Sequence, residues 1–328
     1  RVDARKVRDL MDRWTQAARM MSSLGIPLVQ GLRMLVNGPS GQLVQIPEPD
    51  EDCVMEPGQN LRQTLDILAG KVPVSIPELP SRLDALMRPY QKEGFSFLYR
   101  ITEQGFGACL ADDMGLGKTL QAIAWLDTLR RKGRLEGLPA LIVAPASLLS
   151  NWKEEAQRFA PELILRIMHP SSPDPWQPEK NLRRKDCHAV ITTYGMAART
   201  SALADLHFPA IILDEAQAIK NAGSARSRAI RSLHGERRIA LSGTPVENNL
   251  NELWSLMEFL NPGLLGSRKS FESFTRSLER GYAPLRRLVR PFILRRMKTD
   301  PALVPDLPDK TEIPAYCSLT PEQAALYQ

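Results

Sequence analysis

Short runs of consecutive apolar residues alternate with helical segments along most of the chain after residue 80. The runs that have the length of a buried strand are Ala108–Ala111, Ala140–Ala144, Leu163–Met168, Ala189–Thr193, Ala210–Leu213 and Ile239–Leu241. Apolar residues at helical spacing predict helices over residues 89–104 and near 119–132, 148–159, 195–204, 222–233 and 248–260. Strands without polar alternation that are separated by helices indicate a parallel sheet covered on both faces, so the expected fold class is α/β. Ligands of such folds bind at the carboxyl ends of the strands.

The first 80 residues have a different pattern. Apolar positions in 1–46 have helical spacing, 61–68 predicts one short helix, and 47–52 and 73–80 are rich in proline. We interpret residues 1–80 as an appended segment that ends in a linker, and the sequence does not indicate its role. Because the chain begins without an initiator Met, we expect it to be the inside of a longer protein or a trimmed form.

The composition is that of a globular protein with a mild positive charge. Apolar residues make up 43% and charged residues 24% of the chain, and the formal net charge is +6. We find no apolar run of membrane-spanning length and no cleavable leader. The cysteines, Cys53, Cys109, Cys187 and Cys317, lie far apart, with no Cys-x-x-Cys pair and no histidine at metal spacing. We therefore expect no zinc site, no disulfide framework and no membrane partner, and a cytoplasmic protein, nucleoid-associated if it is bacterial.

A glycine loop follows the first predicted strand, in the stretch 107–120, GACLADDMGLGKTL. A strand, a glycine loop, Lys-Thr and a helix form the arrangement that binds nucleotide phosphates: Lys118 would reach the β- and γ-phosphates and the Thr119 hydroxyl would ligate Mg²⁺. The general pattern has a glycine five positions before Gly117, where this chain has Asp112. The alternative is a strand-to-helix turn that merely needs glycines, and the rest of the chain favours phosphate binding.

Two adjacent acids, Asp214 and Glu215, follow the buried run 210–213. Acids at the exit of a buried strand are costly unless they face a cation or water. In a nucleotide-hydrolysing site Asp214 would hold Mg²⁺, largely through water, and Glu215 would orient and polarise the attacking water. A solvated acidic turn is the alternative, which the phosphate loop on the same alternating scaffold makes less favourable.

Small polar residues follow the other predicted strands. Such residues are the usual contacts to a nucleic-acid backbone, although each could also be ordinary turn chemistry. Those expected to face a nucleic-acid backbone are Ser147, Asn151, Trp152, Thr193, Ser242 and Thr244.

Several ordered motifs resemble those of Swi/Snf-type (Snf2 family) ATPases, a branch of helicase superfamily two. They are ADDMGLGKT, LIVAPASLLSNW, ITTYG, DEAQAIKN and LSGTPVENNLNELWSLMEFLNPG, preceded by LMRPYQ and followed by PFILRRMKTD and LPDKTEIPAYCSLTPEQ. The resemblance covers about residues 86–328 and accounts for Asp112, which this family carries at that place. The Gln of DEAQ is more similar to bacterial and archaeal members.

The resemblance implies a RecA-like doubly wound parallel sheet and an ATPase, stimulated by double-stranded DNA, that translocates along DNA and remodels protein–DNA contacts, generally without separating the strands. It also implies that Gln217, Ser242 and Thr244 couple the nucleotide state to the DNA-facing surface. The chain has no recognition-helix or zinc-finger signature, so we expect no reading of the DNA sequence.

The resemblance assigns catalysis to Lys118, Asp214 and Glu215, metal ligation to Thr119 and Asp214, and the adenine contact to Gln91. The implied nucleotide contacts are Arg88, Gln91, Asp113, Met114, Gly115, Leu116, Gly117, Lys118, Thr119 and Leu120. Implied cofactors are ATP and Mg²⁺, and we expect a monomer that acts on DNA and on DNA-bound proteins.

The domain plan that follows has an ATP-binding lobe over 81–262, a basic helical insertion over 263–310, and the start of a connection to a second lobe over 311–328. In this family the second lobe supplies arginines to the ATP site, and such arginines contribute roughly a thousandfold or more in rate. We therefore expect the chain alone to bind nucleotide weakly and to hydrolyse it very slowly.

The stretch 266–300 is strongly basic. It holds ten Lys and Arg residues and three acids, so its net charge of +7 exceeds that of the whole chain. One interpretation is an insertion that offers charge to DNA phosphates; the other, equally weighted, is a solvated basic face above buried aromatic residues. Arg295 and Arg296 are better interpreted as structural or interlobe residues.

Two other functions stay open. A strand-separating DNA or RNA helicase of the same superfamily would share the loop and the acids, although the Asp112-bearing loop and the basic insertion count against it. A nucleotide-gated scaffold without turnover would retain the fold but not the chemistry, and the presence of Lys118, Asp214 and Glu215 counts against that function.

Overall fold

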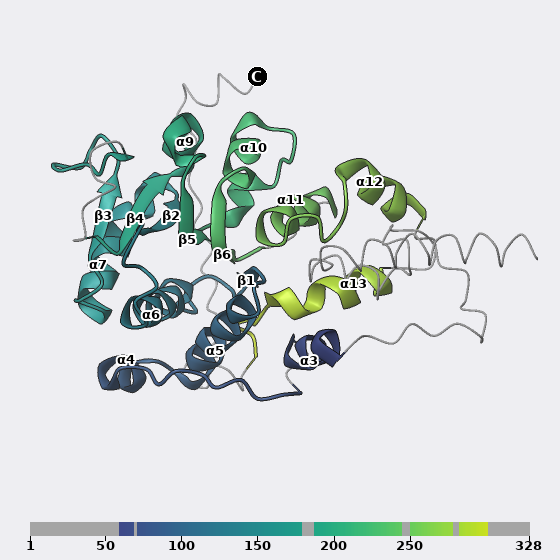
Figure 1. The fold of residues 1–328 in the computed structure, drawn as a ribbon, viewed down its shortest axis with the longest axis horizontal. Coiled ribbons are helices and arrows are strands. Elements are labelled where there is room, and N and C mark those ends of the chain that lie inside the picture. The colour runs from purple at the N-terminus through teal and green to yellow at the C-terminus, as the bar shows by residue number, and fades with distance from the viewer. Residues whose placement is uncertain (1–58, 69–70, 179–186, 245–249, 278–281, 301–328) are drawn as a thin grey trace, which may run out of the picture. The chain divides into compact units, whose positions relative to one another are not determined.

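A seven-stranded, all-parallel sheet forms the centre of the structure, a computed structural model that describes residues 59–68, 71–178, 187–244, 250–277 and 282–300 (Figure 1). The strand order is β3-β4-β2-β5-β6-β1-β7. The strands are β1 (Ala108–Leu110), β2 (Ala140–Ala144), β3 (Leu165–Met168), β4 (Ala189–Thr193), β5 (His207–Leu213), β6 (His234–Leu241) and β7 (Ile293–Leu294). The predicted parallel α/β sheet is confirmed.

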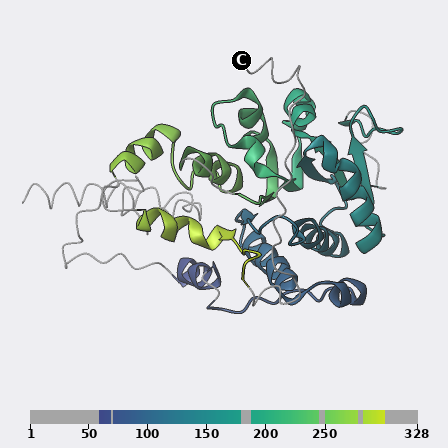
Figure 2. The same ribbon diagram turned by 180° about the vertical axis from the view of Figure 1, so that it is seen from behind.

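Helices cover both faces of this sheet, as the two opposite views show (Figures 1 and 2). On one face lie α5 (Pro89–Glu103), α6 (Lys118–Arg131) and α7 (Leu149–Phe159), which contact one another in sequence order. On the other lie α9 (Tyr194–Arg199), α10 (Ala225–Arg231) and α11 (Leu250–Leu260). The remaining described elements are α3 (Gln59–Leu68), α4 (Ser81–Leu86), α12 (Arg268–Ser277), α13 (Ala283–Val289) and the short 3₁₀ segments η1 (Ala146–Leu148), η2 (Ser201–Leu203), η3 (Ala216–Ile219) and η4 (Arg290–Phe292).

The helix α6, which follows the glycine loop, is buried on nearly all sides. Every residue from Leu120 to Leu129 is buried. The helix therefore contacts the core over more of its surface than the single apolar face that helical spacing predicts. The indole N–H of Trp125 donates to Thr102 Oγ1 of α5 at 3.1 Å, which satisfies the polar atom of a fully buried side chain. α6 ends near Gly133, whose φ of 67° stops the helix.

One strand was not predicted. β7 has only two residues and lies inside the stretch predicted as a basic insertion, yet it pairs in parallel with β1 and forms one edge of the sheet. Ala111 N donates to Leu294 O at 2.7 Å and extends this pairing past the end of β1. The sheet therefore continues into the stretch predicted as an insertion. The described residues from 59 to 297 belong to one compact unit, and residues 298–300 belong to a second.

The register brings the carboxyl ends of the strands to one edge of the sheet. Leu110 of β1 lies opposite Leu241 of β6, and Leu213 of β5 lies opposite Ala240. The residues that follow β1, β5 and β6 are therefore neighbours in space, although they are distant in sequence. Among the helices that the structure describes, none is both long and apolar enough to cross a membrane.

Candidate functional site

The loop between β1 and α6 has the geometry of an anion-binding turn. Gly115 and Gly117 have φ values of 82° and 75°, which favour glycine. The Lys118 ammonium is buried and donates to the backbone oxygens of Asp112 at 2.7 Å and Asp113 at 3.3 Å. α6 begins at Lys118 without a side-chain cap, so the first amides of a 14-residue helix face the loop. A cation and a helix N-terminus thus meet in one turn.

The side chain of Gln91 on α5 hydrogen-bonds to the backbone of this loop. Its side-chain oxygen accepts a hydrogen bond from Arg88 N at 3.0 Å, and its amide donates to Leu116 O at 3.2 Å. A Cβ atom at Gly117 would lie 2.4 Å from Gln91 Nε2, so a larger residue there would displace the Gln91 amide, and the φ of 75° would strain it. The predicted contact of Gln91 with adenine stays a prediction; its contact with the loop is in the structure.

The pair of acids after β5 is held rigidly. Asp214 is 5% exposed, and its carboxylate accepts from the Trp152 indole at 2.7 Å and from Glu215 N at 2.9 Å. Burial raises the pKa of the Asp214 carboxyl, which the Trp152 hydrogen bond and the Lys118 charge partly oppose. A nearby cation would relieve this penalty.

Glu215 has the only positive φ among the described non-glycine residues, 50°, a left-handed conformation uncommon for glutamate. The Tyr194 hydroxyl donates to Asp214 O at 2.7 Å and lies 3.5 Å from Glu215 O. Burial, together with the charges of Asp214 and Glu215, raises the pKa of the Tyr194 phenol well above its ordinary value, so it remains a donor. Tyr194, which was not predicted as a site residue, therefore fixes the turn that presents Glu215.

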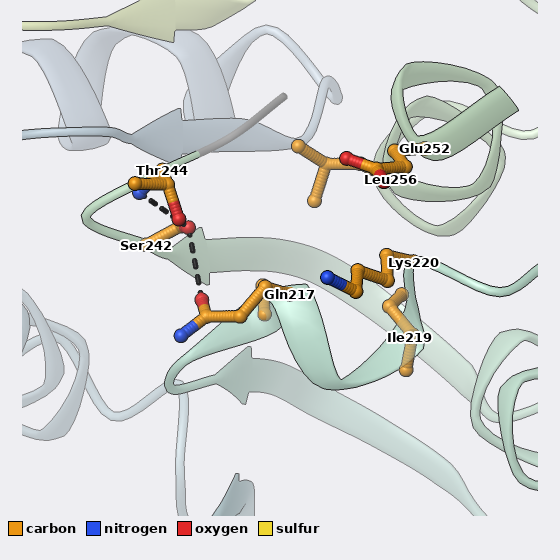
Figure 3. Close-up of a pocket in the computed structure, with 8 residues that line it drawn as sticks. Gln217, Ile219, Lys220, Ser242, Thr244, Glu252 and Leu256 are labelled. Carbon is orange, nitrogen blue, oxygen red and sulfur yellow. Dashed lines mark hydrogen bonds between the residues drawn. The ribbon is translucent and has the colours of Figure 1, made fainter. Parts of the chain in front are cut away.

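A chain of hydrogen bonds, which we call the Gln217–Ser242 relay, connects Glu215 to Thr244 just after β6. The Gln217 amide donates to Glu215 Oε2 at 2.6 Å, Ser242 Oγ donates to Gln217 Oε1 at 3.0 Å, and Thr244 N donates to Ser242 Oγ at 3.1 Å. Figure 3 shows the last two bonds at the rim of a small pocket. That pocket is lined by Ala216, Gln217, Ile219, Lys220, Ser242, Thr244, Glu252 and Leu256, so it joins η3, the β6 exit and α11. These residues have the connectivity expected of a coupling element.

The remaining predicted site residues have different surroundings. Trp152 is fully buried, so the prediction that its side chain faces DNA is wrong; the indole instead holds Asp214. Thr193 is partly buried and its hydroxyl caps α9 by accepting from Met196 N at 3.1 Å. Ser147 and Asn151 are exposed beyond β2.

The residues predicted to contact nucleotide also differ in exposure. Met114 is 70% exposed at the tip of the loop, whereas the Leu116 and Leu120 side chains are buried. Any nucleotide contact from these two leucines must therefore come through their backbone. Thr119, the second residue of α6, is partly buried beside the loop.

Both interpretations of the basic stretch have support in different residues. Phe271, Phe274 and Phe292 are buried beneath it, and Arg268 pairs with Glu272 at 2.8 Å along α12. Arg296 is buried, as a structural residue would be. Within the described part of this stretch, the basic residues with exposed side chains are Arg268, Lys269, Arg276, Arg286, Arg287, Arg290, Arg295 and Lys298.

The residues at this edge fit a magnesium-bound nucleotide. The Lys118 ammonium and the free amides of α6 suit phosphate oxygens, and two glycines with positive φ form the turn. Asp214 is a buried carboxylate whose charged form burial disfavours, which is the environment that a bound cation would stabilise. Thr119 and Asp214 are the residues that could hold the metal.

The sheet, its flanking helices and this loop define a RecA-like α/β lobe. The ATPase core of a Sulfolobus solfataricus SWI2/SNF2 protein, solved with double-stranded DNA, superposes with a TM-score of 0.64 at 42% identity, over 77% of this chain and 53% of that one. The SNF2-related domain matches residues 90–328. The chain belongs to this SNF2-related family.

Relatives from bacteria and fungi are similar to the same part of the chain. YwqA of Bacillus subtilis, which is named for ATP-dependent helicase or translocase activity, is 45% identical over 249 residues. The chromatin-remodelling ATPase INO80 of Vanderwaltozyma polyspora is 40% identical over 273 residues. These matches cover 74% and 76% of this chain but 27% and 17% of the relatives, so the chain spans about a quarter or less of their length.

Proposed function

We propose that this chain is the nucleotide-binding lobe of an ATP-driven translocase on double-stranded DNA. The observation that carries the proposal is the convergence of Lys118, Asp214, Glu215 and the Gln217–Ser242 relay at the carboxyl edge of β1, β5 and β6. The double-stranded DNA in the similar Sulfolobus structure supports duplex DNA as the partner.

Each residue of the site has a part in this proposal. Lys118, placed by the carbonyls of Asp112 and Asp113, neutralises phosphate charge, and Glu215 orients the attacking water and accepts its proton. Thr119 and Asp214 would hold Mg²⁺, which would neutralise charge on the phosphates. The relay from Glu215 through Gln217 and Ser242 makes the position of the carboxylate sensitive to the β6 exit. Without a second lobe, hydrolysis by this chain alone is expected to be very slow.

Steady-state ATP hydrolysis by the intact protein tests the proposal, with double-stranded DNA, single-stranded DNA, RNA or no nucleic acid. Strong stimulation by the duplex alone is the expected result. Stimulation only by single strands or RNA would identify a helicase, and an unwinding assay on a tailed duplex would then follow. Absence of hydrolysis with every nucleic acid, while nucleotide still binds, would identify a nucleotide-gated scaffold.

The exposed arginines of α13 and η4 are expected to contribute to DNA binding. Replacing Arg286, Arg287 and Arg290 together by Gln should weaken binding of any duplex sequence about equally. The negative slope of log affinity against log salt should become shallower by as much as about 2.7, since each of three lost phosphate contacts contributes roughly 0.9. Fluorescence anisotropy over a salt series measures this slope.

The matched control removes the same charge from another helix, at the end of α6. Arg131, Lys132 and Arg134 are exposed at and just beyond the end of α6, which begins at the loop and runs away from it. Replacing these three by Gln should leave the slope unchanged. An equal loss of slope in both triple variants would show that net charge, and not this surface, binds DNA.

The hydrogen bond from Trp152 to Asp214 is expected to matter for metal use. In Trp152→Phe the carboxylate loses its 2.7 Å donor, and a hydrogen bond to a charged group contributes roughly 1.5–3 kcal/mol. We expect the Mg²⁺ concentration for half-maximal hydrolysis to rise about tenfold or more. A magnesium titration of ATPase rate measures it.

Trp176→Phe is the control for this variant. Trp176 is 2% exposed, and within the described residues its indole N–H has no hydrogen-bond partner. Both substitutions remove the same buried atoms, so both should lower the thermal midpoint, but only Trp152→Phe should change the magnesium requirement. Equal magnesium curves would reduce Trp152 to a packing role.

A further inference from the structure

Arg296, the last residue but one of the first compact unit, lies buried at the base of the glycine loop. Its guanidinium makes a bidentate ion pair with Asp112, with Nε 3.0 Å from Oδ1 and Nη2 2.5 Å from Oδ2. The Arg296 side chain is 7% exposed and that of Asp112 is fully buried. Asp112 is the residue at the position where the general loop pattern has glycine.

The same guanidinium binds two helices on either side of the loop. Nη2 donates to Gln121 Oε1 of α6 at 3.0 Å, and Nη1 donates to the backbone oxygen of Tyr90 on α5. Its carbon lies 5.3 Å from the centre of the Tyr90 ring, a cation–π distance. A Cβ atom at Gly94 would lie 1.7 Å from Gln121 Oε1 and 2.7 Å from Arg296 Nη2, so glycine leaves the room for this cluster.

The contact also runs through the backbone. Asp113 N donates to Arg296 O at 3.1 Å, which continues the β7 pairing into the loop itself. The backbone oxygens of Asp112 and Asp113 are those that hold the Lys118 ammonium. Arg296 therefore fixes, by side chain and backbone, the two residues that place Lys118.

We propose that Arg296 is a positioning residue for nucleotide binding, which holds the entry of the phosphate loop through Asp112 and couples the shape of this loop to the chain that follows β7. This inference rests on the proposed nucleotide-binding function. A guanidinium suits the task because its planar fork meets both carboxylate oxygens and still reaches Gln121 and Tyr90, which a lysine ammonium cannot do at once.

Charge supports the same role. An uncompensated carboxylate in the loop would repel an incoming phosphate, and in a buried place this repulsion is weakly screened. The guanidinium neutralises Asp112, so this buried carboxylate does not offset the positive charge of Lys118 in the loop. The Glu93 carboxylate lies 3.9 Å from Arg296 Nη1 and is 73% exposed, so this second ion pair contributes little to neutralising the guanidinium.

Binding of a fluorescent ADP analogue with Mg²⁺ to the intact protein tests the inference in Arg296→Lys. This variant keeps a positive charge beside Asp112, but loses the bidentate geometry and the reach to both helices. We expect the dissociation constant to rise about tenfold, measured well below the thermal midpoint of the variant, with Arg295→Lys as the exposed neighbour control at the wild-type value. A folded Arg296→Lys variant with the wild-type dissociation constant would overturn the inference.

If Arg296→Lys does not fold, the double variant Asp112→Asn/Arg296→Gln removes both buried charges together and leaves neither unpaired. It should fold and bind the analogue at least about tenfold more weakly than the wild type; wild-type affinity would again overturn the inference. The wild type separates the two proposals. If wild-type protein binds no nucleotide, the proposed function fails; if it binds and these variants bind equally well, only the role of Arg296 fails.

Discussion

Replacing Glu215 by Gln is expected to lower the rate of ATP hydrolysis by about a thousandfold while nucleotide still binds. A positioned general base contributes roughly 10²–10⁴ in rate, and an amide cannot accept the proton of the attacking water. The substitution keeps the size of the side chain, and the amide oxygen can still accept the hydrogen bond that Gln217 donates at 2.6 Å. The loss should therefore fall on kcat and leave the relay to Ser242 in place.

Hydrolysis and nucleotide binding are measured on the same preparation of the intact protein, with duplex DNA present. Glu236→Gln is the matched control, because Glu236 is exposed near the start of β6, at the opposite edge of the sheet. It should hydrolyse ATP as the wild type does. A Glu215→Gln variant with a normal rate would assign water activation to another group, and a variant that no longer binds nucleotide would make Glu215 part of the binding surface.

The central part of the fold could be predicted because its signals are local. Apolar runs of strand length located β1 to β6, and the glycine loop and Asp214–Glu215 could be recognised because each carries its chemistry within a few residues. β7 could not be predicted, since two residues give no periodicity and it gains its stability from pairing with β1. Its place in the sheet is a property of the tertiary structure alone.

The supporting residues of the site were harder to predict for a related reason. Arg296 and Asp112 are 184 residues apart, and within a basic stretch one buried arginine looks like its exposed neighbours. Trp152 follows a strand exit among polar residues, which is also the pattern of a nucleic-acid contact, and only the fold shows its indole N–H pointing at Asp214. Tyr194 directly follows Thr193, so the strand exit was a usable signal, but the choice between the two required the hydrogen bond to Asp214 O.

These supports share one physical feature: each is a buried polar side chain that satisfies another buried group of the site. Trp152 and Tyr194 hold the Asp214–Glu215 turn, and Arg296 holds the loop that carries Lys118. A buried polar group without its partner costs free energy, so the fold keeps such groups in one arrangement. Buried hydrogen bonds therefore hold the residues beneath the glycine loop and the Asp214–Glu215 turn in one arrangement. Met114, at the exposed end of the loop, and Thr244, at the end of the hydrogen-bond chain from Glu215, lie farther from these buried groups.

Replacing Lys118 by Ala is expected to weaken nucleotide binding by about a hundredfold and to remove measurable hydrolysis. Lys118 is the cation of the loop, and hydrogen bonds to charged groups contribute roughly 1.5–3 kcal/mol each. The substitution also leaves the carbonyls of Asp112 and Asp113 without the ammonium that they accept from at 2.7 and 3.3 Å, so the thermal midpoint is measured beside the dissociation constant. A fluorescent ADP analogue with Mg²⁺ reports binding directly.

Lys132→Ala is the matched control, because Lys132 directly follows the other end of the same helix and its ammonium donates to the Tyr99 hydroxyl. Both variants remove one lysine at an end of α6, but only Lys118 lies at the loop. The control should bind nucleotide as the wild type does, whatever its effect on stability. If Lys118→Ala binds as tightly as the wild type while folded, the phosphates do not lie in this loop, and the site must be sought at another strand exit.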